Sequence, residues 1–326
     1  MQQTVILTLL DLISLKGIFS FGYVLFVLIT IGVIIHDKRD PVKALSWIVV
    51  LILLPVAGFL LYIVFGRNHR KEKLFNRKEL HDLEQIDEMS REQVYAINNA
   101  ALLLRSEITE NRDIITLLLN SNKALLTNHN RIRVLNNGTV TFDEIKAALR
   151  GARSSIHLEY YIIEDDPLGR EIAEILIGKA REGVEVRLIY DDFGCINKKL
   201  PRHYDRVLKK YGIKCCVFNP FRPFLSAVLN NRDHRKIAII DGHTGITGGI
   251  NLADEYINKL ERFGYWKDSG VRLEGPGATA LANIFLTFWK AQYPDEEIDM
   301  DRDLPLAAPV KTDCLVQPFA DSPVDR

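Results

Sequence analysis

Two long runs without a charged side chain lie near the start of the 326-residue chain and limit what its first part can fold into. The first run covers residues 17–35 and the second covers residues 44–65. As helices, both runs come close to the roughly 30 Å thickness of a bilayer's hydrocarbon core. Trp47 and Tyr62 lie near the ends of the second run, where amphipathic rings favour the membrane interface. We therefore expect residues 1–66 to form a transmembrane helical hairpin.

Basic side chains cluster directly after the second run and indicate how this hairpin is oriented. Residues 67–80 carry six basic and two acidic side chains, whereas residues 36–43, between the runs, carry three and two. Because basic flanks stay on the cytoplasmic side, residues 67–326 are expected in the cytoplasm. A cleaved signal peptide and a buried hairpin of a soluble protein are the alternatives. The first lacks a preceding basic cluster and a small-residue cleavage pattern.

The overall composition conceals this segregation of charge. The whole chain has 42 basic and 42 acidic residues, and a net charge of zero argues against a dedicated nucleic-acid binder. Its four cysteines, Cys195, Cys215, Cys216 and Cys314, form no Cys-x-x-Cys pair. Their spacing indicates free thiols in a reducing compartment, not a zinc site or a disulfide framework.

The rest of the chain divides into three parts. Residues 67–126 are expected to form a basic juxtamembrane segment and a helical neck. Strand and helix patterns then alternate, which predicts an α/β domain over residues 127–294 with a mixed, largely parallel sheet flanked by helices. Residues 295–326 are acidic and have no apolar period, so we expect a linker. The strand patterns lie at 131–135, 154–163, 184–190, 213–218 and 269–275, and the helix patterns at 141–150, 168–181, 201–212 and 278–292.

The most informative stretch covers residues 231–256. His234 and Lys236 are two residues apart, so on a strand they project from the same face. The apolar residues 237–240 that follow suit a strand buried on both sides. Asp241 then begins a turn. Two polar side chains are thus expected on a rigid element at the edge of a core.

A second short strand leads to Gly248, Gly249 and Asn251. The glycines allow backbone to approach a ligand closely, and the asparagine offers an amide donor at the same point. A neutral imidazole can attack phosphorus directly, while an ammonium and an amide stabilise the charge that develops on the phosphoryl oxygens. The stretch therefore suits phosphodiester chemistry.

Together these residues form the pattern His-x-Lys-x4-Asp-x6-Gly-Gly-x-Asn, which resembles the HKD signature of the phospholipase D superfamily. Gly249 stands where that signature usually has serine. This form, the twin apolar runs and stretches such as LEYYII and YWKDSGVRLEGPGA are similar to bacterial cardiolipin synthases. The resemblance implies a multi-pass protein of the bacterial cell membrane that converts two phosphatidylglycerol molecules to cardiolipin and glycerol. It also implies a phosphatidyl-histidine intermediate and no metal or other cofactor.

The resemblance also implies roles for single residues. His234, Lys236 and Asp241 are the expected catalytic set, with His234 as nucleophile or general acid and Asp241 supporting the local structure. Lys236, Asn251, Gly248 and Gly249 are expected to bind the substrate phosphate. Asp268 resembles the carboxylate that orients the imidazole, with an ordinary surface aspartate as the alternative. For Glu159 there is a comparable choice between a site carboxylate and an ordinary residue, and it is left unassigned.

One feature of the family is not found here. Its members carry two HKD motifs that share one site, and no further His-x-Lys follows His234. We expect that the chain is truncated, with residues 295–326 leading toward a missing second HKD domain; a homodimer that completes the site is the alternative. Phospholipid and the bilayer are the expected partners, and nucleic acid is not. Two other functions stay open, a hydrolase of phospholipid or nucleic-acid phosphodiesters and a non-catalytic membrane protein with half a site.

Overall fold

The computed structural model describes most of the chain in two compact units. Met1–Arg70 and Arg222–Leu229 form the first unit, and Lys71–Phe221 and Asn230–Arg326 form the second. The basic cluster expected at residues 67–80 lies outside the described residues. These are 17, 21–35, 41–62, 81–98, 105–196, 200–220, 232–262, 264–305 and 307–320.

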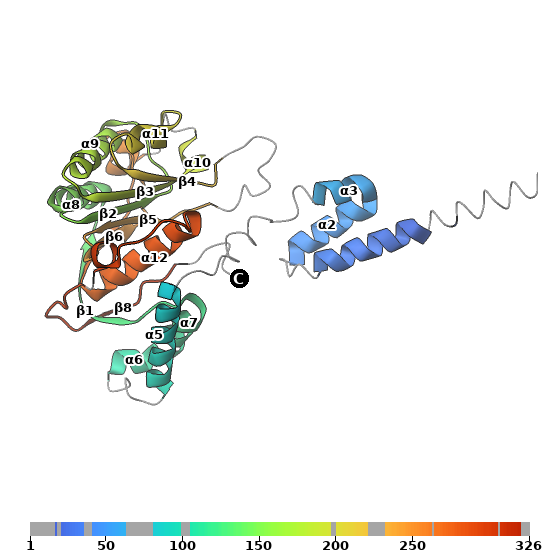
Figure 1. Ribbon diagram of the computed structural model, residues 1–326, viewed down its shortest axis with the longest axis horizontal. Helices are drawn as coiled ribbons and strands as arrows, with labels where there is room; N and C mark the ends of the chain where they lie inside the picture. Colours follow the sequence, from blue (N-terminus) through green and yellow to red (C-terminus); the bar gives the residue numbers. More distant parts are fainter. Residues whose placement is uncertain are drawn as a thin grey trace, which may run out of the picture. The chain divides into compact units, whose positions relative to one another are not determined.

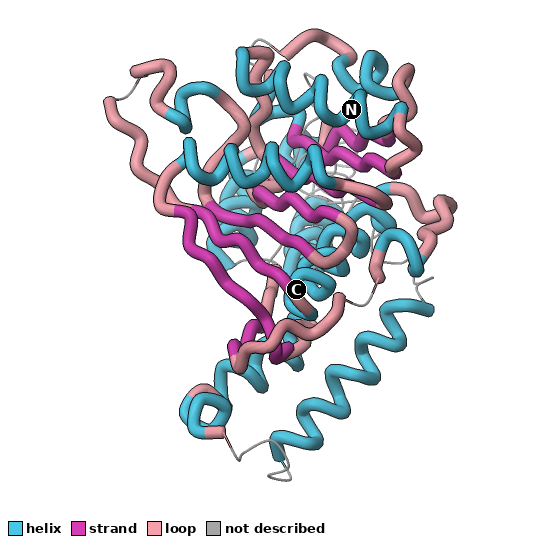
Figure 2. The backbone as a smooth tube through the Cα atoms, turned by 90° about the vertical axis from the view of Figure 1, so that its left-hand side faces the viewer, coloured by secondary structure: helices cyan, strands magenta, loops and turns pink. Residues whose placement is uncertain are grey.

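The described part of the second unit contains an eight-stranded sheet with helices on both of its faces (Figure 1). The strand order is β4-β3-β2-β5-β6-β7-β1-β8, and Figure 2 shows the twist of this sheet. The strands are β1 Thr127–Leu135, β2 Ser155–Tyr160, β3 Glu185–Asp191, β4 Lys214–Phe218, β5 Lys236–Ile240, β6 Thr244–Gly248, β7 Gly270–Glu274 and β8 Cys314–Val316. The helices are α5 His81–Asn98, α6 Ser106–Glu110, α7 Arg112–Asn122, α8 Gly138–Gly151, α9 Pro167–Arg181, α10 Asp192–Cys195, α11 Tyr204–Lys209, the 3-10 helix η2 Asp254–Ile257, α12 Pro276–Gln292 and α13 Met300–Asp303.

The α/β class is confirmed, but the prediction of a largely parallel sheet was wrong. In the described sheet only β2 with β3 and β3 with β4 pair in parallel, and the other neighbours are antiparallel. Helices α9 and α11 lie in the connections between these parallel neighbours. After β5 the chain turns back at Asp241 and Gly242, whose φ angles of 51° and 65° suit a tight hairpin. A tight turn can join only antiparallel strands, so β6 pairs antiparallel with β5. A longer connection that includes η2 then leads to β7, which pairs antiparallel with β6.

Side-chain alternation along β2 divides the core into two layers. Ile156, Leu158 and Tyr160 pack with α8 and α9 on one face of the sheet. His157 and Glu159 point to the opposite face, where α12 covers the sheet, and the His157 ring stacks on Phe285 at 4.9 Å. The prediction of a strand buried on both sides over residues 237–240 is confirmed, since all five residues of β5 are buried. All six residues of β2 are buried as well. Two ionisable side chains are consequently held in the layer beneath α12.

The first unit contains residues 21–35, which are helical, and the helices α2 Pro41–Leu53 and α3 Pro55–Leu61. The second apolar run was expected to form one kinked helix. The structure interrupts it at Leu54, whose φ of −138° and ψ of 71° are not helical, because a proline disfavours helical backbone in the residue before it. Within the described ranges, none of the helices combines the length and apolar character needed to cross a bilayer.

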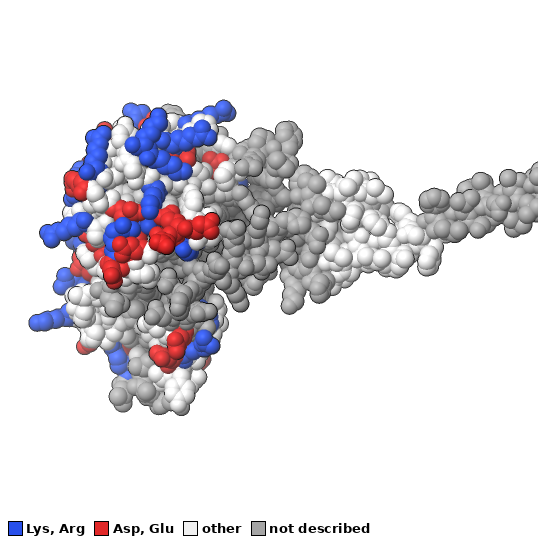
Figure 3. All heavy atoms as spheres, viewed as in Figure 1, with Lys and Arg blue, Asp and Glu red and all other residues white. Residues whose placement is uncertain are grey.

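The helices of the first unit share a small core and leave many apolar side chains exposed. Ile34, Leu51 and Tyr62 are buried, and the Tyr62 ring lies 5.6 Å from that of Trp47. Figure 3 draws the described atoms of this unit entirely in the colour of uncharged residues. The exposed apolar side chains include Phe21, Leu28, Ile29, Leu53 and Val56. A surface of this kind marks a site of contact with lipid or protein.

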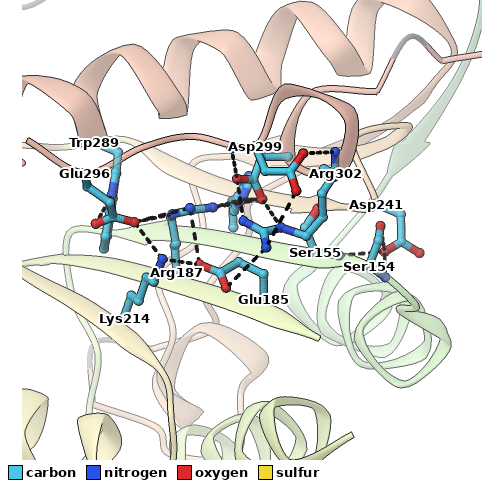
Figure 4. A network of polar contacts seen from close by, with 12 residues as sticks. Ser154, Ser155, Glu185, Arg187, Lys214, Asp241, Trp289, Glu296, Asp299 and Arg302 are labelled. Carbon is cyan, nitrogen blue, oxygen red and sulfur yellow. Dashed lines mark hydrogen bonds and ion pairs between the residues drawn. The ribbon is translucent and has the colours of Figure 1, made fainter. Parts of the chain in front are cut away.

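The acidic tail, expected to be a linker, is part of the second unit as far as residue 320. Its strand β8 pairs with β1, and the Asp303 carboxylate is fully buried 2.9 Å from the Arg187 guanidinium. Glu296 accepts hydrogen bonds from Arg187 and from the Trp289 indole, in the network of Figure 4. Two carboxylates of the tail thus compensate the buried Arg187 guanidinium, which neither the composition of the tail nor its lack of an apolar period could indicate.

The neck is joined to the same tail. Gln317 donates hydrogen bonds to the backbone carbonyls of Ile115 and Ala124, and Leu315 packs against the small core of α5, α6 and α7. The predicted neck, domain and linker are therefore distinct stretches of sequence but not separate structural units. From Lys71 onward, their described residues belong to one compact unit.

Candidate phosphodiester site

Several strand ends meet at one edge of the sheet and bring the predicted site residues together. Tyr160, the last residue of β2, pairs with Lys236, the first residue of β5, because the two strands are antiparallel. By the same geometry Gly248 at the end of β6 pairs with Gly270 at the start of β7. The sequence elements that precede β5 and β7 or follow β2 and β6 consequently converge on this edge.

His234 and Lys236 are in direct contact, as predicted. The Lys236 Nζ lies 2.9 Å from His234 Nδ1 and donates to the His234 carbonyl oxygen at 2.5 Å. The strand begins only at Lys236, so His234 belongs to the segment that leads into it. Lys236 is buried while the histidine is exposed, which leaves the imidazole accessible to a substrate.

Both side chains have shifted pKa values. Partial burial and the neighbouring Lys236 ammonium lower the pKa of His234, and Asp233 opposes this. Burial lowers the pKa of Lys236 to about 8, against the attraction of Asp233 and Asp268. The histidine is therefore mainly neutral at pH 7, which is the state that a nucleophile needs.

Tyr161 is a site residue that the sequence reasoning missed. Its ring centroid lies 4.6 Å from that of His234, and the Lys236 ammonium lies 5.4 Å from it. Gly194 in α10 packs directly against the backbone and ring of Tyr161, and a Cβ there would clash with both. The sequence offered one signal for this residue. Tyr161 directly follows Tyr160, the last residue of β2, and therefore lies at the edge of the sheet where β5 begins.

Gly249 and Asp268 lie against each other. A Cβ on Gly249 would lie 2.6 Å from Asp268 Oδ2, so the absence of the usual serine fits a site in which a carboxylate occupies that space. Asp268 also attracts the Lys236 ammonium. The structure thus places Asp268 in the site beside the lysine, and its role in orienting the imidazole stays a prediction.

Asn251 is buried, and both ends of its amide already have protein partners. Its Oδ1 accepts a hydrogen bond from the Ile162 backbone N–H, and its Nδ2 donates to the Tyr256 hydroxyl. One amide hydrogen remains for a phosphate. In this geometry Asn251 fixes the chain just after Tyr161, so it supports the site as well as being a candidate to bind substrate.

Asp241 lies at the opposite end of β5 from Lys236, on the order of 15 Å away for a strand of this length. Its carboxylate accepts hydrogen bonds from the backbone N–H groups of Arg153, Ser154 and Ser155 and from the Ser154 hydroxyl. Burial opposes ionisation, but these donors lower its pKa overall. The geometry supports the expected structural role and removes Asp241 from the set that could touch a substrate at His234.

The described residues contain no group of three or more His, Cys, Asp or Glu side chains that could hold a metal ion. The four cysteines are free thiols, and burial raises the pKa of Cys195, Cys215 and Cys216 to about 12. Such thiols are protonated and unreactive at neutral pH. The imidazole of His234 remains the predicted nucleophile or general acid at this edge.

Comparison with known families fits this geometry. Residues 145–268 match the family model described as "Cardiolipin synthase, PLD-like domain", and residues 24–67 match the model "Phospholipase_D-nuclease N-terminal". The chain belongs to the phospholipase D superfamily. The first match contains the edge at which His234, Lys236 and Asp268 meet, and the second covers most of the two apolar runs.

Curated relatives within this superfamily are cardiolipin synthases. The enzyme of Halalkalibacterium halodurans is 38% identical over 304 residues, which is 91% of this chain and 58% of that protein. The major cardiolipin synthase ClsA of Bacillus subtilis is 36% identical over 282 residues, or 83% of this chain and 56% of that protein. The chain thus spans less than two thirds of the length of these relatives.

Among solved structures, NucT from Helicobacter pylori matches over 50% of this chain and 96% of its own, with a TM-score of 0.38 and 18% identity. A likeness at this level carries no argument about function.

The contact between Gly249 and Asp268 predicts a cost for adding a methyl group. We expect Gly249→Ala to lower the free energy of unfolding by about 1–3 kcal/mol, because the new Cβ must displace the carboxylate. Gly178→Ala is the matched control. It lies within α9 with nothing inside 4 Å of the new Cβ, and should raise stability by about 0.5–1 kcal/mol. Urea denaturation of the solubilised chain would measure the free energy of unfolding of both variants. Equal changes in Gly249→Ala and Gly178→Ala would contradict the contact between Gly249 and Asp268.

Proposed function

We propose that this chain supplies one catalytic half of a phosphatidyltransferase that converts two phosphatidylglycerol molecules to cardiolipin and glycerol. The supporting observation is the contact between an exposed, neutral imidazole at His234 and the Lys236 ammonium, in a domain of the cardiolipin synthase type. A nucleophile and a cation are thereby placed where a phosphodiester could reach both.

In the first step, a ring nitrogen of His234 attacks the phosphorus of one phosphatidylglycerol. The bond from phosphorus to the headgroup glycerol oxygen breaks, and glycerol leaves with a proton from a general acid. In the second step, a headgroup hydroxyl of another phosphatidylglycerol attacks the phosphatidyl-histidine. The phosphorus–nitrogen bond breaks, the hydroxyl proton passes to the base left by the first step, and cardiolipin is released.

Lys236 has a part in both steps. In the structure its Nζ lies against His234 Nδ1, so a charged lysine directs the ring proton to Nε2. A bound phosphodiester would draw the ammonium onto its oxygens and release Nδ1, which allows the tautomer with a nucleophilic Nε2. The ammonium then stabilises the charge that develops on the phosphoryl oxygens.

The general acid of the first step belongs, in this proposal, to a second HKD motif. A single edge of this kind provides one histidine, whereas the reaction needs a nucleophile and a proton donor on opposite sides of the phosphorus. A second domain or a partner chain would supply that histidine.

We further propose that the first unit anchors the protein in the bacterial cell membrane as a two-span hairpin, with the second unit on the cytoplasmic side. The exposed apolar side chains of the first unit support this, as does the match of residues 24–67 to an N-terminal family segment. The interspersed basic and acidic residues on the visible face of the second unit in Figure 3 favour a lipid over a nucleic acid, which would require a basic groove.

The pH dependence of phosphatidyl transfer tests whether His234 reacts in its neutral form and Lys236 in its charged form. We expect kcat/KM to rise through the pKa of His234, which lies below the ordinary 6.5, and to fall above about pH 8, where Lys236 loses its proton. Lys236→Arg should lower the rate and remove the fall on the alkaline side, because arginine stays charged. An alkaline fall that survives in Lys236→Arg would assign it to another group.

Product analysis tests the function itself. The chain would be incubated with vesicles of radiolabelled phosphatidylglycerol, alone and with a full-length cardiolipin synthase whose own first-motif histidine has been replaced. We expect cardiolipin and glycerol only when both are present. Phosphatidic acid would instead indicate a hydrolase, and no product in either mixture a non-catalytic protein. Steady glycerol release by a demonstrably monomeric preparation would contradict the need for a second histidine.

A further inference from the structure

Glu159 is a fully buried carboxyl group for which neither the sequence nor the proposed reaction has a use. It lies on β2, in the layer beneath α12, with no exposed surface. The Arg235 guanidinium lies 2.8 Å from its Oε1. Within the described part of the chain, neither of its two oxygens has a hydrogen-bond partner.

Asp233 is a second buried carboxyl group at the same guanidinium. Its Oδ1 lies 2.9 Å from Arg235 Nε, whereas its Oδ2 is buried with no hydrogen-bond partner among the described residues. The Arg235 guanidinium also lies 4.0 Å from the ring centroid of Phe288 in α12, so the helix encloses it. One cation, whose side chain is 20% exposed, therefore faces two buried carboxyl groups.

Among the described residues, Arg235 is the cation that acts on Glu159, while Asp233 also attracts the Lys236 ammonium. Asp191 at the end of β3 accepts a hydrogen bond from the Asp233 backbone N–H and lies 3.6 Å from Arg232. Cys216 on β4 has its pKa raised by burial, so its thiol is neutral. Burial first, and then the neighbouring Asp233, raise the pKa of Glu159 well above its ordinary value, against the attraction of Arg235.

We propose that Glu159 is protonated in the folded protein and donates its hydrogen to Oδ2 of Asp233, and that this acid–carboxylate pair positions His234. One shared hydrogen would join an oxygen of Glu159 to Oδ2 of Asp233, while Oε1 of Glu159 faces Arg235, and would leave a single negative charge opposite this guanidinium. Two ionised carboxylates would instead leave a buried charge without compensation, at high cost.

The connection to His234 is direct in the chain. Asp233 and Arg235 flank the histidine, and the strand begins only at Lys236, so no sheet hydrogen bonds hold residues 232–235. Their anchors are the Asp191 carboxylate, which binds the Asp233 backbone, and the cluster of Glu159, Asp233 and Arg235. Glu159 thus acts through its neighbours on where the imidazole lies relative to Lys236 and Tyr161, which makes it a positioning residue.

The protonation state can be tested without lipid turnover. The infrared spectrum of the full chain at neutral pH should show the C=O band of a protonated carboxyl group, which disappears in Glu159→Gln. In an NMR titration, the pKa of His234 should be unchanged in Glu159→Gln and lower in Asp233→Asn, because the charge that raises it lies on Asp233. Absence of the band, or a His234 titration that shifts in Glu159→Gln but not in Asp233→Asn, would overturn the proposal.

The positioning role rests on the proposed function and is tested separately. Glu159→Leu cannot donate a hydrogen bond, and a misplaced nucleophile should slow phosphatidyl transfer by about 10²-fold relative to Glu159→Gln. Equal rates in the two variants, with the infrared and NMR results as expected, would reject the positioning role but keep the shared hydrogen. Failure of the proposed function would remove transfer in the unmodified chain and leave the spectra as predicted.

Discussion

Replacing His234 by alanine is expected to abolish cardiolipin formation, with a loss of more than about 10³-fold in rate. In the proposed reaction the exposed imidazole is the nucleophile, and without it this chain can form no phosphatidyl-histidine. The measurement is the amount of cardiolipin produced from labelled phosphatidylglycerol. The assay contains the full-length cardiolipin synthase with a replaced first-motif histidine, which supplies the second HKD motif. Acid-labile label on the protein should disappear together with the product.

His243→Ala is the matched control. That histidine is also exposed and lies just beyond Asp241, at the opposite end of β5, where its Nδ1 contacts the Thr244 hydroxyl at 3.2 Å. It should retain at least about half of the rate, since surface substitutions away from a site have small effects. Equal loss in both variants, or full activity in His234→Ala, would mean that the motif has been misinterpreted.

Asp303→Ala is expected to lower the free energy of unfolding by about 3 kcal/mol. The substitution removes the fully buried carboxylate 2.9 Å from the Arg187 guanidinium, which keeps only Glu185 and Glu296 at 3.2 Å among its described partners, and loss of a member of a buried ion-pair network is costly. Urea denaturation followed by tryptophan fluorescence suits the measurement, because Trp289 belongs to the same network.

Asp301→Ala separates the buried pair from a general effect on α13. Asp301 is exposed on the same short helix, so its loss should change stability by less than about 0.5 kcal/mol. Hydrogen bonds from His157, Arg302 and Arg187 hold the pKa of Asp303 below its ordinary 3.8, although burial opposes this. The stability from this carboxylate is therefore present above pH 3.8 and lost as the pH falls below it. Asp303→Ala should lack that acid-dependent loss, and a cost as small as that of Asp301→Ala would contradict the pairing.

Local pattern was sufficient to predict the elements around the site. The strands β2, β3 and β4 and the helices α8 and α9 lie where apolar runs and glycine-terminated helices indicated. The sheet was predicted to be largely parallel because strand and helix alternate up to β4. After β5 the turn at Asp241 and Gly242 reverses the chain, and the length of the connection decides the direction of the next strand.

The site was only partly predictable. The spacing of His234 and Lys236 predicted that they share a face of one strand. They do contact each other, although the strand begins only at Lys236 and His234 lies in the segment before it. Tyr161, Asp233 and Arg235 carry no such signal, since their contacts depend on which strands become neighbours. Asp268 was assigned from resemblance alone, and its contact with Gly249 depends on the pairing of β6 with β7.

The sequence by itself determined the chemistry of this protein, namely the HKD motif, the two apolar runs and the strand and helix periods of the second unit. These are local properties, which depend on side-chain type and on spacing along the chain. Only the tertiary structure decided that the acidic tail supplies partners to Arg187, and that Glu159 and Asp233 face the same guanidinium of Arg235. Such contacts join residues far apart in sequence, and burial makes each charge depend on partners that local pattern cannot specify.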